Sequence, residues 1–264
     1  MSPFRLASLL ALAVLLSFLA IPIVAIFVEA GPRELVDSLG REGSLEALWL
    51  SLRTSLVAVV AILVVGTPAA FLLARRSFRG RAALITVIEL PLVLPPAAAG
   101  IALLAAFGPQ GLVGGAIEDA GVQLVLQTAG VVVAMTFVAA PFYVRGAMAA
   151  FEAIDPDLLD ASRTLGAGEG RTFARIAIPG ARAGLASGLA LAWGRALGEF
   201  GATLLFAGSL EGRTQTAPLA IFRFLASDFD ASLALSGVLV LFSAALLLGV
   251  KFLGCTPEAS RAAR

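Results

Sequence analysis

Residues 151–179 read FEAIDPDLLDASRTLGAGEGRTFARIAIP, and they separate two long apolar segments, 122–144 and 183–207. Each of the two exceeds the roughly 20 residues that a helix needs to cross a bilayer core of about 30 Å. The same test identifies four further segments. The six predicted spans are 6–28, 54–74, 82–107, 122–144, 183–207 and 231–250. The sequence therefore predicts an all-α integral membrane protein, with a single membrane domain over residues 1–264.

The composition favours the same class. Hydrophobic residues make up 59% of the 264 residues and charged residues 14%, against about 45–50% and about 25% in soluble domains. A soluble domain this apolar would expose larger apolar patches than soluble proteins tolerate. The span 6–28 is longer than the roughly 7–15 apolar residues of a signal peptide. We therefore expect an uncleaved first helix, with a signal peptide as the alternative.

Missing residue types exclude several kinds of chemistry. The chain has no His and a single Cys, Cys255, which excludes a His-based proton relay, a His/Cys zinc site and an intrachain disulfide. The only lysine, Lys251, lies outside any GxxxxGK[ST] phosphate loop. We expect no catalytic residue, metal or cofactor in this chain, so ATP-driven work needs a partner's ATPase. An ion-coupled secondary transporter or channel is the alternative from a different class.

Positive charges are unevenly divided between the segments that connect the predicted spans. Thirteen lie on one side of the membrane and four on the other. Because cytoplasmic loops carry the excess of Lys and Arg, both termini and the loop 145–182 are predicted to be cytoplasmic. The thirteen are Arg5, Arg75, Arg76, Arg79, Arg81, Arg145, Arg163, Arg171, Arg175, Arg182, Lys251, Arg261 and Arg264, and the four are Arg33, Arg41, Arg213 and Arg223.

The loop 145–182 is predicted to carry a short capped helix. Asp155, followed by Pro156, is a typical start, because Asp caps the first backbone amides and Pro fits the first helical position. Gly166 is a typical stop, and a second amphipathic piece is expected to end at Pro179. One partly apolar face is expected on the first helix, formed by Leu158, Leu159, Ser162 and Leu165. That face can dock in a partner's groove or pack on the chain's own membrane domain.

Two predicted spans contain features that an ordinary span lacks. The span 82–107 contains Pro91, Pro95 and Pro96, which predict a kinked or broken helix, with 82–94 as a possible cytoplasmic interface segment. The span 183–207 has glycines at i,i+4 spacing, which lets helices approach closely. These glycines are Gly184, Gly188, Gly194 and Gly198.

Arg195 and Glu199 lie one turn apart in the span 183–207. They can pair on one helix face, which offsets much of the cost of charge in the membrane. Two interpretations stay open. The pair can lie beside a pathway, where Arg195 would meet a passing anion, or it can be a structural ion pair in the bundle.

Asp160-Ala161-Ser162, then Gly166, then Ile176-Ala177-Ile178-Pro179 resembles the EAA loop of ABC importer permeases. The family usually has Glu first and Ala third, where this chain has Asp160 and Ser162. The resemblance implies the type I ABC importer permease architecture, in which this loop is the coupling helix that docks on a separate ATPase subunit. The coupling residues it implies are Asp155, Leu158, Leu159, Asp160, Ala161, Ser162, Leu165, Gly166, Ile176 and Pro179.

Four further stretches resemble the permease subunits of molybdate/tungstate importers. They are PLVLPP at 91–96, RTLGAG at 163–168, LGEFGAT at 197–203 and RTQTAPLAIF at 213–222. The resemblance implies a homodimer of permeases in the cytoplasmic membrane, two ATPase subunits that hold ATP-Mg, an extracytoplasmic oxyanion-binding protein, and no nucleic acid. Since molybdate, tungstate and sulfate are all tetrahedral dianions, a sulfate/thiosulfate permease stays an alternative. The gate residues expected between the two copies are Gly194, Arg195, Gly198, Glu199, Gly201 and Thr203.

Overall fold

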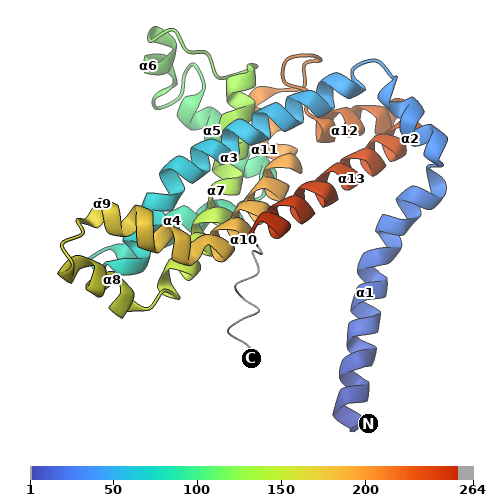
Figure 1. Ribbon diagram of the computed structural model, residues 1–264. Coiled ribbons are helices and arrows are strands. Elements are labelled where there is room, and N and C mark those ends of the chain that lie inside the picture. The colour runs from blue at the N-terminus through green and yellow to red at the C-terminus, as the bar shows by residue number, and fades with distance from the viewer. Residues whose placement is uncertain (1, 255–264) are drawn as a thin grey trace.

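The computed structural model describes residues 2–254, and every regular element in that range is a helix (Figure 1). Five helices are long and apolar enough to cross a membrane, or six if the bent pair α4–α5 counts as one span. Cys255, Arg261 and Arg264 lie outside the described residues. The elements are α1 (Pro3–Glu29), α2 (Pro32–Leu39), α3 (Ser44–Arg75), α4 (Arg81–Val93), α5 (Pro96–Phe107), α6 (Gly114–Asp119), α7 (Thr128–Glu152), α8 (Pro156–Thr164), α9 (Glu169–Thr172), the π-helix η1 (Phe173–Ala177), α10 (Ile178–Leu197), α11 (Gly201–Ala207), α12 (Ala217–Ser227) and α13 (Phe229–Gly254).

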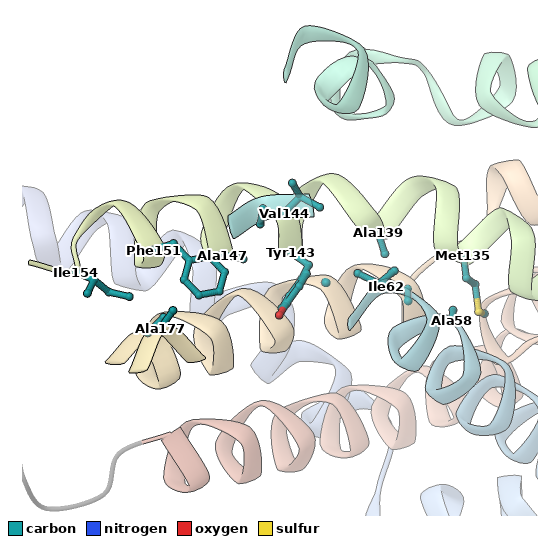
Figure 2. Close-up of a cluster of buried hydrophobic side chains, with 14 of the residues drawn as sticks. Ala58, Ile62, Met135, Ala139, Tyr143, Val144, Ala147, Phe151, Ile154 and Ala177 are labelled. Atoms are coloured by element: carbon teal, nitrogen blue, oxygen red, sulfur yellow. The ribbon is translucent and has the colours of Figure 1, made fainter. Parts of the chain in front are cut away.

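Helix α7 lies at the centre of the bundle and packs against α3 and α10. Figure 2 shows its buried side chains, with Tyr143 and Phe151 facing the neighbouring helices. The packing is close because small residues stand opposite α7: a Cβ at Gly184 would meet Ala150 Cβ at 2.4 Å, and one at Gly188 would meet Tyr143 O at 3.3 Å. Lipid gives no hydrophobic drive for helix association, so such close contact is the main source of cohesion.

The fourth span differs from its predicted range 122–144. Helix α7 begins only at Thr128 and continues to Glu152. The residues before it are not helical, and φ is positive at Gly121 (84°) and Leu126 (56°), which a helix does not tolerate. Apolar composition alone predicted the early start, because it does not show where a turn replaces the helix.

The predicted span 82–107 is broken, as its prolines indicated. Helices α4 and α5 are bent by 119° relative to each other. The break lies at Leu94 and Pro95, both extended (ψ 130° and 141°). Each of these residues precedes a proline, which disfavours the helical region for it.

The structure corrects two expectations about the predicted span 183–207. The span contains two helices instead of one, and the amphipathic segment before it does not end at Pro179. Helix continues from α9 through η1 into α10, so Pro179 lies within its first turn rather than at an end. Ile178 N–H donates to Phe173 O and closes a wider π turn. The next residue, Pro179, has no N–H to donate. At its other end α10 stops at Leu197, and α11 begins at Gly201.

The remaining helices lie around this bundle. Helix α1 stands apart in Figure 1, has no buried residue, and contacts mainly α13. The short helix α12 precedes α13, and Ser51 of α3 caps it by accepting a hydrogen bond from Ala217 N–H at 2.7 Å. Asp228 lies between α12 and α13. Its carboxyl has a pKa below the usual range, first because it accepts a hydrogen bond from Ala231 N–H and second because it accepts one from the Arg41 side chain.

Candidate coupling and translocation sites

Helix α8 is capped at both ends by the residues that the sequence indicated. Asp155 Oδ1 accepts a hydrogen bond from Asp157 N–H at 2.9 Å. At the other end Gly166 has φ +83°. Gly166 N–H donates to Arg163 O at 2.9 Å and Ala167 N–H to Ser162 O at 3.0 Å. These two bonds form the Schellman arrangement, which needs a left-handed residue after the C-cap.

The apolar residues of α8 do not form the single face that was expected. Leu159 and Ser162 are buried against the chain's own bundle, and Ser162 Oγ lies 2.7 Å from Thr172 Oγ1. Leu158 and Leu165 point away from it and are 57% and 88% exposed. Leu159 and Ser162 are three residues apart and share one side of the helix, whereas Leu158 and Leu165 are seven apart and share another, so α8 has one anchored face and one free apolar face.

An aromatic cluster joins the α8–α9 segment to the ends of three long helices. Phe71 of α3 lies 5.2 Å from the ring of Phe151 in α7 and 5.0 Å from that of Phe173 in η1, between centroids. Arg75 of α3 donates to Ile154 O at 2.6 Å. The loop is therefore a packed extension of the bundle, in contact with the ends of α3 and α7.

The other expected coupling residues are divided between the side that packs on the bundle and the side that faces solvent. Ile176 is partly buried against the core cluster, whereas Asp160, Ala161 and Pro179 are exposed. Asp160 pairs with Arg163 on the solvent side at 2.8 Å. None of the three Phe residues of the aromatic cluster was predicted, since they are far apart in sequence: Phe71 lies in a predicted span, and Phe151 and Phe173 lie in the loop 145–182.

The second region lies at the far end of α10, where the two broken spans meet. Helices α5 and α11 pack against each other and against α7. Their approach is too close for side chains at two glycines: a Cβ at Gly201 would lie 2.6 Å from Pro96 Cβ, and one at Gly100 would lie 2.8 Å from Leu205 Cβ. Irregular backbone at membrane depth is tolerated where it is buried in protein or lines a cavity.

Arg195 and Glu199 form the expected ion pair, but across the break instead of along one helix. Arg195 Nη2 lies 2.6 Å from Glu199 Oε2, and their side chains are 29% and 1% exposed. The other carboxylate oxygen, Oε1, accepts from Ala202 N–H at 2.8 Å in the first turn of α11. Arg195 is in the last turn of α10 and not at mid-span, as the continuous helix had implied.

The remaining gate candidates differ in their surroundings. Gly184 and Gly188 pack against α7 within the subunit, whereas a Cβ at Gly194 would meet only Leu247 at 3.9 Å and Gly198 is exposed. Thr203 is fully buried, and its Oγ1 has no hydrogen-bond partner. The structure thus brings Arg195, Glu199 and α11 together, and places them at the opposite end of α10 from the α8 segment.

The fold is that of a multi-pass membrane protein: a helical bundle with two broken spans and a packed loop helix. Residues 62–253 match the family of binding-protein-dependent transport system inner membrane components. The chain belongs to this family.

Similar proteins include two kinds of transport system permease. The molybdenum transport system permease protein ModB of Mycobacterium tuberculosis is 42% identical over 88% of this chain and 88% of its own. The sulfate transport system permease protein CysW of Synechocystis is 35% identical over 80% of this chain and 77% of its own. A bacterial ABC transporter that imports alginate has the same fold, with a TM-score of 0.76, 18% identity, and coverage of 95% of this chain and 94% of that one.

Proposed function

We propose that this chain is the membrane-spanning permease subunit of an ATP-driven importer of molybdate or tungstate. ATP is hydrolysed on a separate subunit, which docks on the free face of α8. The relative at 42% identity over 88% of the chain carries the choice of anion. A sulfate permease is the second candidate, supported by the 35% identity to the sulfate relative.

The free face of α8 supports a docking partner. Leu158, Ala161 and Leu165 are exposed on a helix whose opposite side is fixed to the bundle. Leu158 and Leu165, two turns apart, present apolar surface beyond the predicted membrane spans, where only a partner can cover it. An apolar groove on the ATPase subunit would bury these side chains, as a helix-in-groove contact does.

Leu165→Asp should uncouple the ATPase subunit without unfolding the permease. Leu165 is 88% exposed, so the change leaves the chain's own packing intact, while a charge in the docking groove costs several kcal/mol of association. We expect ATPase co-purification and binding-protein-dependent molybdate uptake in vesicles to fall at least about tenfold. Arg171→Gln, an exposed change on α9 outside this face, is the control. Unchanged uptake by Leu165→Asp would overturn the docking assignment.

We also infer that the permease works as a homodimer with the broken spans at the contact. Gly194 and Gly198 have small-xxx-small spacing and little or no packing partner within the described part of the chain. A second copy is the partner that such a surface fits. The gate residues Gly194, Arg195, Gly198, Glu199, Gly201 and Thr203 would then lie at or next to the contact between subunits.

The arginine asymmetry supports cytoplasmic termini and a cytoplasmic α8. In a Cys255→Ser background, a membrane-impermeant thiol reagent added to intact cells should label Glu42→Cys, which lies between α2 and α3. It should leave Ser77→Cys, between α3 and α4, unlabelled. Both positions are exposed, so the reverse pattern would contradict the orientation.

A further inference from the structure

A basic cavity of about 270 Å³ lies between the end of α3 and the α8–α9 segment. Figure 1 shows these elements at one end of the bundle. One wall is apolar and comes from the membrane-spanning part of α3: Pro68, Phe71 and Leu72. The other wall carries three guanidinium groups, from Arg75, Arg76 and Arg163.

The guanidinium groups retain hydrogen-bonding capacity towards an anion. Arg75 uses Nη2 to donate to Ile154 O, and its buried Nε has no hydrogen-bond partner. Arg76 makes its ion pair with Glu169 at 2.6 Å, where both side chains are largely exposed. Each guanidinium has five N–H donors, so one ion pair leaves donors free. Arg163 pairs at 2.8 Å with Asp160, which lies outside the lining, and Glu169 is the sole carboxylate within it. Three guanidinium groups thus face two carboxylates, and the charge of Arg75 is the one that neither carboxylate pairs with.

The two walls together match a phosphate attached to an apolar chain. Arginine forks fit phosphate oxygens in bidentate geometry. Leu72 is 47% exposed and precedes Arg75 and Arg76 by about one turn of α3, so an acyl chain can continue along the helix while its headgroup stays in the cavity. Basic pockets at the cytoplasmic ends of spanning helices are the usual places where anionic headgroups bind.

We propose that this cavity binds the phosphate of an anionic phospholipid from the cytoplasmic leaflet. The inference rests on the orientation given under the proposed function. Arg75 and Arg76 belong to α3 and Arg163 to α8, so one phosphate joins the membrane-spanning helix to the segment that faces the ATPase. The phosphate competes with Glu169 for Arg76, so lipid charge adjusts how firmly α9 is held to α3.

The test measures binding of short-chain phosphatidylglycerol to the purified permease by native mass spectrometry, with phosphatidylcholine of the same chain length alongside. We expect phosphatidylglycerol to bind at least about tenfold more tightly. Arg76→Gln with Arg163→Gln should weaken its binding about tenfold. Arg79→Gln removes an arginine from the same segment but outside the cavity, and should leave binding unchanged.

Three results would overturn the proposal. The first is equal binding of the two lipids, and the second is an equal loss of phosphatidylglycerol binding in the Arg79→Gln control. The third is displacement of the lipid by inorganic phosphate at matched concentration, which would make the site one for free phosphate. Arg76→Lys keeps the charge and should retain most of the binding, which guards against a variant that only misfolds. The binding assay needs neither the ATPase nor the transported anion. A failed uptake experiment therefore does not contradict the lipid-binding proposal, and absence of lipid binding does not contradict the proposed function.

Discussion

Gly166→Val is expected to leave the permease in the membrane and to abolish its coupling to the ATPase. Gly166 has φ +83°, a region in which a β-branched residue is strained by about 1–3 kcal/mol. Nothing lies within 4 Å of the position where its Cβ would be, so the strain is entirely in the backbone. It is relieved by unwinding the end of α8, which moves Leu165 off the docking face. ATPase co-purification and molybdate uptake in reconstituted vesicles measure the effect.

Gly168→Val is the matched control for this change. Gly168 also has nothing within 4 Å of a Cβ, but its φ is −67°, which any residue adopts. The added volume is the same and the strain is absent, so Gly168→Val should retain most of the uptake. Gly166→Asn should fall between the two, because Asn tolerates the left-handed region better than valine. Equal activity of Gly166→Val and Gly168→Val would show that the α8 stop plays no part in coupling.

The caps of α8 were predictable from sequence because each depends on its neighbours along the chain. Asp155 needs only the amides that follow it, and Gly166 needs only the carbonyls that precede it. The side on which the helix is anchored was not predictable. Leu158 and Leu159 are adjacent and equally apolar, and only the position of Phe151 and Phe173 decides that Leu159 is buried.

The breaks in the spans were predictable to different degrees. The break between α4 and α5 was predictable from the consecutive prolines Pro95 and Pro96, because proline disfavours the helical conformation of the residue before it. The one between α10 and α11 has no proline, and the i,i+4 spacing of Arg195 and Glu199 favoured a continuous helix. The structure achieves the same ion pair across the break, because Glu199 also caps α11. A charge pair at helical spacing is thus weak evidence that the helix continues.

Single changes at the Arg195–Glu199 pair should have unequal effects. Glu199 is 1% exposed and Arg195 is 29% exposed. Arg195→Met strands a buried carboxylate, which should cost about 3–5 kcal/mol of stability. Glu199→Gln should cost less, because the amide oxygen can still accept from Ala202 N–H and Arg195 keeps partial access to solvent or a partner. The midpoint of thermal unfolding in detergent and the yield of assembled complex measure both changes.

The double variant, Arg195→Met with Glu199→Gln, separates a structural pair from an anion contact. Removing both charges removes the stranded carboxylate, so assembly should recover relative to Arg195→Met. We expect uptake of molybdate per assembled complex to recover with it, because Glu199, which binds Arg195, already accepts a hydrogen bond from the first turn of α11. The exposed pair Arg223–Glu211 provides the control: its double neutralisation should change stability by less than about 1 kcal/mol. A complex that assembles and keeps binding-protein-stimulated ATPase activity but carries little molybdate would instead place Arg195 in contact with the passing anion.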